Sequence, residues 1–199
     1  MRALPPLIVL TDGRQAADAG HDLRDVVGAV MDAGGEELAV VVRERHLPPA
    51  ERVALMAWAG QRATASGSLV IAASPPTAPD QAVHLTAAEP FPTKRPHVVG
   101  RSCHDAGELR AAASEGCDYA TLSPIFTTDS KPGYGPALGV TALGGSPLPV
   151  YALGGVTGAN AGACREAGAV GVAVMGAVMG SSDAAATVTQ LLDVLGGHR

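Results

Sequence analysis

Aromatic residues are scarce in the sequence. Phe, Trp and Tyr make up 3% of it, although 47% is hydrophobic. A core of this composition must be built mostly from Ala, Val, Leu and Gly, and small side chains let helices pack close to strands. Basic runs are also lacking, and the net charge is −5. Nucleic acid is therefore not an expected partner, because phosphate backbones are bound by clustered cationic faces.

Cysteines are few, and long apolar runs are missing. Cys103, Cys117 and Cys164 are odd in number and widely separated, so they are expected to be buried or semi-buried free thiols rather than metal ligands. The opening "MRALPPLIVLTDG" has a short apolar run with two prolines and no signal-peptide cleavage pattern. These absences predict a soluble, cytoplasmic protein with no membrane partner.

Short apolar runs alternate with helix-like stretches along the chain. The runs are continuous and rich in β-branched residues, which is typical of parallel strands covered on both faces. The pattern predicts a (β/α)8 TIM barrel forming a single domain over residues 1–199, with a doubly wound open sheet as the alternative. The connections around residues 74–96 are short and proline-rich, so short or missing helices are expected there. The eight expected strands are 7–12, 37–45, 68–74, 82–86, 97–103, 118–126, 148–155 and 169–179.

Charged and polar residues follow several of these runs, where the chemistry of such barrels takes place. In "VVRER", Arg43 and Arg45 are two residues apart and face the same way if the strand continues. They can then converge on one anion, since guanidinium suits carboxylate and phosphate. The alternative is a surface salt bridge through Glu44.

The loop at 127–139 combines hydroxyls, an acid and a lysine within a few residues. Lys131 can neutralise a substrate anion, and Thr128 and Ser130 can donate hydrogen bonds to it. The alternative interpretation is a solvated polar loop without a ligand.

Glycines end the last two expected strands. Gly154 and Gly155 follow "VYAL", and Met175 and Gly176 follow "GVAV". Backbone N–H groups at such turns bind oxyanions, and the last two units of a barrel frequently hold a phosphate. The alternative is that these glycines only make tight turns.

His104, in "GRSCHD", is the candidate for proton transfer, because the pKa of a histidine lies near neutrality. A lone histidine before a helix is nevertheless more often structural than catalytic. Asp105 is expected to cap that helix, and His84, in "AVHL", is expected to be a strand residue.

Taken together, these stretches resemble the thiamine phosphate synthase/TenI superfamily over nearly the whole chain. The resemblance is carried by "VRER", "AVHL", "GRSCH", "DYATLSPIFTTDSKPG" and "VYALGGVTGANAGACREAGAVGVAVMGAV". It implies a barrel fold, a role in thiamine biosynthesis and a small-molecule thiazole phosphate as partner. Members often self-associate, so a homo-oligomer is also an expectation.

One branch of this superfamily is the synthase, which joins an aminopyrimidine pyrophosphate to a thiazole phosphate and needs Mg²⁺. Its usual Asn-Asp pair after the third strand is replaced here by Ala72, Ala73 and Ser74. Asp80 and Glu89 are the remaining acids that could rebuild a metal site, which would need carboxylate oxygens.

The other branch is the thiazole tautomerase, which aromatises a thiazole carboxylate phosphate by a proton shift without a metal or cofactor. The resemblance assigns His104 as its acid/base. It assigns Gly154, Gly155 and Gly176 as phosphate contacts and Thr128, Ser130 and Lys131 as substrate-loop residues. The loss of the Asn-Asp pair favours this branch. The synthase with Mg²⁺ and a non-catalytic binder of thiazole or thiamine phosphates are the alternatives.

Overall fold

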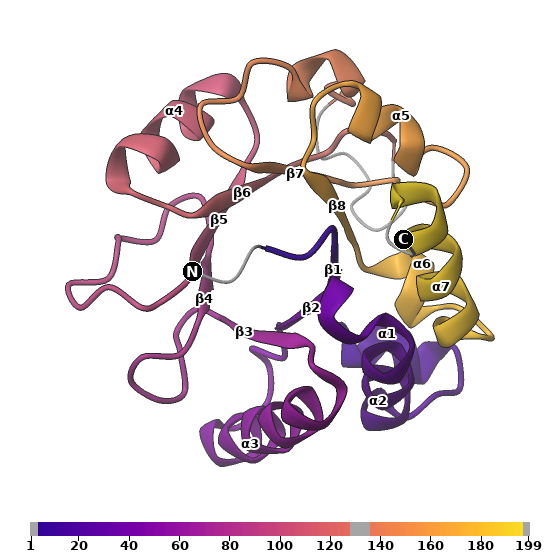
Figure 1. Cartoon of the computed structure of the whole chain (residues 1–199). Helices are drawn as coiled ribbons and strands as arrows, with labels where there is room; N and C mark the ends of the chain where they lie inside the picture. The colour runs from indigo at the N-terminus through magenta and orange to yellow at the C-terminus, as the bar shows by residue number, and fades with distance from the viewer. Residues whose placement is uncertain (1–3, 128–135, 197–199) are drawn as a thin grey trace.

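The computed structural model describes residues 4–127 and 136–196. In these residues eight parallel strands close into a barrel in sequence order, with β8 paired to β1. Figure 1 shows the strands as an inner ring with the helices outside it. The predicted (β/α)8 fold is confirmed, and the open-sheet alternative is wrong. The strands are β1 Leu7–Leu10, β2 Leu38–Val42, β3 Leu69–Ala73, β4 Val83–Leu85, β5 Val99–Cys103, β6 Tyr119–Leu122, β7 Val150–Leu153 and β8 Gly171–Val174.

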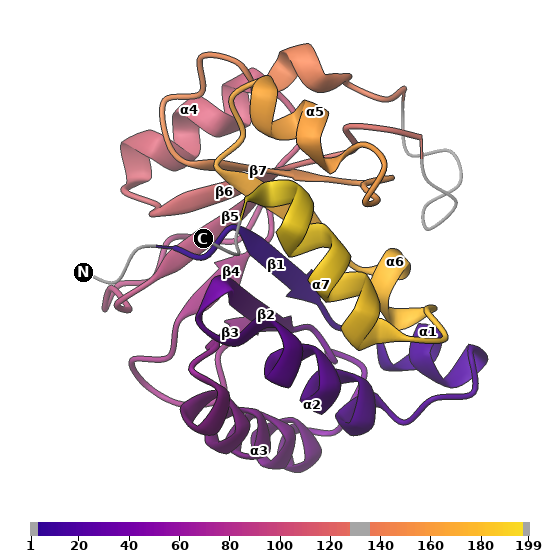
Figure 2. The same ribbon diagram turned by 45° about the vertical axis from the view of Figure 1, so that its right-hand side comes forward.

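Helices cover the barrel unevenly. In both views α2 lies against α7, outside β1 (Figures 1 and 2). Aspartates cap several helices, and Asp105 caps α4 as predicted, accepting from the Glu108 N–H. The helices are α1 Gly13–Asp18, α2 Leu23–Gly34, α3 Pro49–Ser66, α4 Ala106–Glu115, α5 Ala161–Glu166, α6 Gly176–Met179 and α7 Ala184–Leu195, with 3-10 turns η1 Gly35–Glu37 and η2 Val140–Leu143.

Two short helices, α1 and α6, depart from the sequence prediction. The last apolar run extends to Met179, with Gly176 expected at the end of its strand, but β8 ends at Val174 and Gly176 begins α6. A continuous apolar run has the same pattern in a buried strand and in a buried helix, so hydrophobic periodicity cannot separate them.

The connections on either side of β4 contain no helix in the described chain, which confirms the prediction for residues 74–96 (Figure 1). The Arg101 side chain, which is 5% exposed, fills part of the space that a helix next to β4 would cover. Its guanidinium donates to the carbonyl oxygens of Thr86 (2.9 Å), Ala87 (3.1 Å) and Glu89 (2.7 Å). It also pairs with Glu115 of α4 at 2.6 Å. The loop after β4 is therefore fixed to the neighbouring unit.

Two tyrosines fill the inside of the barrel. Tyr119 and Tyr151 are fully buried, and their rings meet edge to face at 5.5 Å. Each has a glycine beside it: a Cβ at Gly100 would lie 2.1 Å from Tyr119 Cζ, and one at Gly171 would lie 2.7 Å from Tyr151 Cε1. An aromatic-poor chain thus places its few large rings where the interior needs volume.

All three cysteines are buried free thiols, as predicted. Burial raises the pKa of each thiol, that of Cys103 to about 12, so the reactive thiolate is disfavoured. Across the described residues, no helix combines the length and apolar character needed to cross a membrane.

The tight fit at Gly100 gives a test of the interior packing. Gly100→Ala places a methyl group against the Tyr119 ring, and overpacking of this kind costs about 1–3 kcal/mol or more. We expect a lower free energy of unfolding in urea titrations. Gly60→Ala is the matched control, because Gly60 lies inside α3 with open space around its Cβ position. This change is expected to leave stability unchanged or raise it. Equal stability of the two variants would contradict the packing account.

Candidate active site

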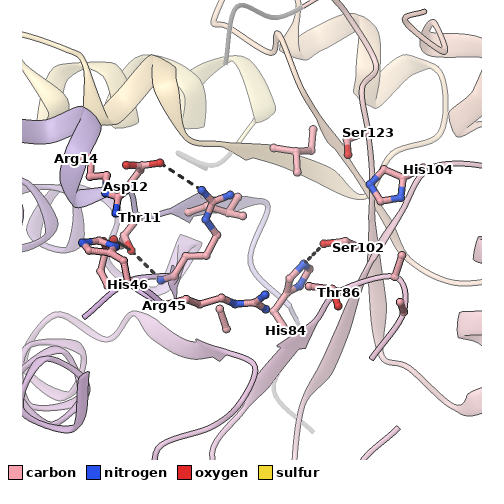
Figure 3. A pocket seen from close by; sticks show the side chains of 17 residues that line it. Thr11, Asp12, Arg14, Arg45, His46, His84, Thr86, Ser102, His104 and Ser123 are labelled. Atoms are coloured by element: carbon pink, nitrogen blue, oxygen red, sulfur yellow. Dashed lines mark hydrogen bonds and ion pairs between the residues drawn. The ribbon is translucent and has the colours of Figure 1, made fainter. Parts of the chain in front are cut away.

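A cavity of about 550 Å³ opens at the carboxyl ends of the strands. Figure 3 shows side chains from several different strand ends converging on it. This is the face on which the barrel fold places chemistry. The cavity is lined by Leu10, Thr11, Asp12, Arg14, Arg43, Glu44, Arg45, His46, Ala73, His84, Thr86, Ala87, Ala88, Ser102, His104, Ser123 and Leu153.

Arg43 and Arg45 both line the cavity, and their predicted convergence on one anion stays a prediction. They lie just beyond β2, and each is oriented by its own carboxylate: Arg43 by Asp12 at 3.3 Å, and Arg45 by Glu89 at 3.6 Å. The alternative of a salt bridge through Glu44 is wrong. Glu44 is 3% exposed and accepts instead from the Thr11 hydroxyl (2.6 Å) and the Gly13 N–H (3.1 Å). It fixes the turn from β1 into α1.

Arg14 is a lining residue that the sequence analysis missed. It belongs to the first turn of α1, whose N-cap Asp12 accepts from the Gln15 N–H at 3.1 Å. Within residues 4–127 and 136–196, Arg14 has no ion-pair partner. An aspartate three residues before Gln15 is a helix-start signal, and this signal could have placed Arg14 in the first turn of a helix. The cavity mouth therefore carries a cation in addition to the two oriented arginines.

His104 lies in the cavity wall directly after β5, with 26% of its side chain exposed (Figure 3). Its Nδ1 is 3.0 Å from Glu108 Oε2, and its backbone N–H donates to the same oxygen at 2.6 Å. An ionised carboxylate only accepts, so Nδ1 carries the proton and the lone pair of the neutral ring lies on Nε2. Glu108 is not among the site residues predicted from the sequence. The Asp-x-x-Glu spacing at a helix start, together with the i, i+4 spacing from His104, is the signal for it.

His84 lies on β4, as predicted, and also lines the cavity floor with Ser102. Burial and the positive charges of Arg45, Arg101 and Arg43 lower the pKa of His84 to about 4, against the opposing effect of Glu89. The imidazole is therefore neutral at physiological pH. Its Nε2 lies 3.0 Å from Ser102 Oγ. Ser102 and Ser123, which the sequence places at strand ends but which were given no role, are hydroxyls of the kind that face a barrel site.

Glu89 and Asp80, the two acids considered for a metal site, are not brought together. Burial alone would raise the pKa of Glu89, but hydrogen bonds from Thr86 and the charge of Arg45 outweigh it and lower that pKa. Asp80 pairs with Lys94 at 2.8 Å, and its carbonyl contacts His97 just before β5, at the opposite end of the barrel. Among the described residues, no three His, Cys, Asp or Glu side chains are grouped to hold a metal ion. These residues do not fit a Mg²⁺ site.

The glycines expected to bind phosphate follow β7 and β8 at the same end as the cavity, but they are not among its lining residues. Gly154 and Gly155 have φ of 91° and 65° and lie against the loop after β6. A Cβ at Gly155 would be 2.4 Å from the Thr127 carbonyl oxygen. Their conformation and this close approach both require glycine. Phosphate binding there and at Met175 and Gly176 stays a prediction.

Thr128, Ser130 and Lys131, the expected substrate-loop residues, lie outside the described residues. Their predicted contacts with a substrate stay predictions.

A profile of the family described as Thiamine monophosphate synthase (TMP-TENI) matches residues 7–178. The chain belongs to this family. A Geobacter sulfurreducens protein, provisionally named a thiamine-phosphate synthase, is 33% identical over 95% of this chain and 93% of its own length. A Laribacter hongkongensis thiamine-phosphate synthase is 43% identical over 51% of this chain and 49% of its own length.

The match covers only part of some relatives. Two Prochlorococcus marinus thiamine-phosphate synthases are 42% identical to 49% of this chain, and the matched region is 29% of each relative. Solved structures agree on the fold. A thiamine phosphate pyrophosphorylase from Pyrococcus furiosus superposes with a TM-score of 0.76 at 21% identity, over 97% of this chain and 96% of that one. The family resemblance inferred from the motifs is confirmed, while the branch within the family is not distinguished.

The low pKa of His84 predicts a pH dependence of stability. Between pH 6.5 and about 4 the unfolded chain binds a proton that the folded chain does not, so stability rises with pH in this window and is lost as pH falls. Lowering the pH from 7.5 to 5 should cost about 2 kcal/mol through this residue.

The measurement is urea unfolding at both pH values. His84→Gln should show a pH dependence smaller by this amount, because it removes the titrating group. An identical pH dependence in the two proteins would show that His84 titrates normally.

Proposed function

We propose that this protein is an enzyme of thiamine biosynthesis that tautomerises a thiazole carboxylate phosphate without a metal or cofactor. The observation that carries the proposal is the His104–Glu108 pair in the wall of a cavity whose nearby carboxylates are already engaged. A proton shift needs a base and acid of near-neutral pKa and no further acidic cluster.

In this proposal His104 Nε2 removes a proton from the thiazole ring system and returns one at the position that makes the ring aromatic. Glu108 holds Nδ1–H, which orients the ring and stabilises the imidazolium that forms between the two transfers. The proton taken is the proton returned, so no oxidant or other reactant is needed. General acid–base help of this kind is worth ~10²–10⁴-fold.

The anionic groups of the substrate are assigned to two regions. Arg14, Arg43 and Arg45 lie around the cavity and suit a carboxylate or phosphate. The phosphate contacts predicted from the sequence stay part of the proposal: Gly154, Gly155, Met175 and Gly176, with Thr128, Ser130 and Lys131. A cytoplasmic location and a homo-oligomeric state are likewise proposals.

Thiamine phosphate synthesis is the second candidate, favoured by the names of the relatives that match the chain. It would need a Mg²⁺ site that does not combine Glu89 with Asp80, because these two acids lie at different ends of the barrel. Tight binding of thiazole or thiamine phosphates without turnover would instead support a non-catalytic binder.

The two reactions are separated by offering the purified protein each substrate set, with and without Mg²⁺. We expect tautomer formation that is unaffected by chelation. His104→Asn should retain ligand binding but lose at least ~10²-fold in kcat, because the general acid–base group is gone.

His97→Asn, which changes a histidine at the far end of the barrel, is the control and should keep full activity. Mg²⁺-dependent formation of thiamine phosphate, or full tautomerase activity in His104→Asn, would overturn the assignment.

Arg14 provides a separate test of anion binding. Arg14→Gln removes a cation from the cavity and should weaken binding of a thiazole phosphate roughly three- to tenfold, because Arg14 is exposed to solvent. Calorimetric titration at low salt measures the affinity. Arg110→Gln removes an exposed charge on α4, outside the cavity lining, and should bind normally. Equal losses in both variants would point to a non-specific charge effect.

A further inference from the structure

A chain of hydrogen bonds runs from the barrel interior to the cavity floor. The Tyr119 hydroxyl lies 2.9 Å from His84 Nδ1, and His84 Nε2 lies 3.0 Å from Ser102 Oγ. The last of these contacts is drawn in Figure 3. Tyr119 and His84 are buried, whereas Ser102 is partly exposed and lines the cavity. The three residues come from three neighbouring strands, β6, β4 and β5.

Gly100 makes this chain sterically feasible. In the strand register it lies between the two rings, opposite His84 on one side and Tyr119 on the other. Because Gly100 has no side chain, the Tyr119 ring crosses over it and stacks on His84, with ring centroids 5.5 Å apart. Any Cβ at this position would occupy the space of the phenol ring.

The hydrogen bonds run in one donor-to-acceptor direction, which is set at the buried end by Tyr119. Burial raises the pKa of Tyr119 well above its usual value, so the phenol keeps its proton. Within the described residues, His84 Nδ1 is the hydrogen-bond partner of this hydroxyl, and a buried O–H needs an acceptor. Tyr119 therefore donates to Nδ1.

The tautomer of His84 sets the direction of the next hydrogen bond, to Ser102. The ring is neutral, because burial and the nearby arginines lower the pKa of His84 to about 4. A neutral imidazole that accepts at Nδ1 carries its proton on Nε2. Nε2–H then donates to Ser102 Oγ, and the Ser102 O–H is left to donate elsewhere. In the described chain His84 is the hydrogen-bond partner of the Ser102 side chain.

We propose that Tyr119 and His84 are positioning residues that fix Ser102 as a hydrogen-bond donor to an anionic oxygen of the ligand in the cavity. The oxygen belongs to a carboxylate or a phosphate, since both present the same acceptor. The reverse direction, in which Ser102 donates to His84, would make Ser102 an acceptor for the ligand. The direction of the hydrogen bonds is a property of the ligand-free protein, and the donor role of Ser102 applies to either reaction considered above.

The direction is measured without any substrate. Nitrogen-15 NMR of histidine-labelled protein at pH 7 distinguishes a protonated ring nitrogen from a bare one, and the His84 signals are assigned by their loss in His84→Gln. We expect a protonated Nε2 and a bare Nδ1. In Tyr119→Phe, the donor that fixes Nδ1 as the acceptor is removed, so signals of both tautomers should appear. A protonated Nδ1 in the unchanged protein would overturn the proposal.

Binding supplies the second measurement. Ser102→Ala should weaken the affinity for the anion it contacts roughly tenfold, as expected for a lost hydrogen bond to a charged group. Inorganic phosphate and thiazole-2-carboxylate are titrated separately to show which anion that is. Tyr119→Phe should weaken the same affinity by a smaller factor, roughly threefold, because Ser102 remains but is less well oriented.

Thr121→Val is the matched control. It also removes a buried hydroxyl from β6, one with no hydrogen-bond partner in the described residues. It should change neither the His84 tautomer nor either affinity. Unchanged affinity for both anions in Ser102→Ala would overturn the proposal, as would a tautomer change in Thr121→Val equal to that in Tyr119→Phe.

Discussion

Closing eight parallel strands into a barrel leaves an interior that only side chains can fill. Here two tyrosines fill much of it, and each requires a glycine on a neighbouring strand. The phenol oxygens of such rings are polar and buried, so each must find a partner. Tyr151 donates to the Pro5 carbonyl oxygen, and Tyr119 reaches His84. Tyr119 therefore both fills the barrel interior and sets the hydrogen bonding of the cavity floor.

At the cavity rim, a loop held by Arg101 takes the place of a helix after β4. No helix follows β4 in the described chain, and the buried Arg101 binds three carbonyl oxygens of the loop that replaces it. That loop carries Glu89, which faces Arg45. The acids near the cavity consequently orient arginines and backbone N–H groups rather than standing free for a metal. This electrostatic arrangement favours binding of an anionic ligand.

Local sequence signals predicted most of the fold. Continuous β-branched runs gave the eight strands, the proline-rich stretch gave the missing helices, and Asp105 was correctly placed as a cap. Hydrophobic periodicity failed at Gly176–Met179, because a short apolar segment looks the same in a strand and a helix. At the site, Arg43, Arg45 and His104 were expected at strand ends and line one cavity, while their roles stay predictions. Arg14 and Glu108 were missed, although short helix-start signals marked them.

The sequence by itself determined the barrel, the family and the end of the barrel where chemistry belongs, because these follow from patterns within a few residues. Tertiary structure alone decided which groups pair. Thr11 and Glu44 are 33 residues apart, and His84 and Tyr119 are 35 apart. Contacts of this kind depend on strand register and on which neighbours lack a side chain, as at Gly100. The tautomer of His84 and the direction of the Ser102 hydroxyl follow from those contacts and leave no trace in local sequence.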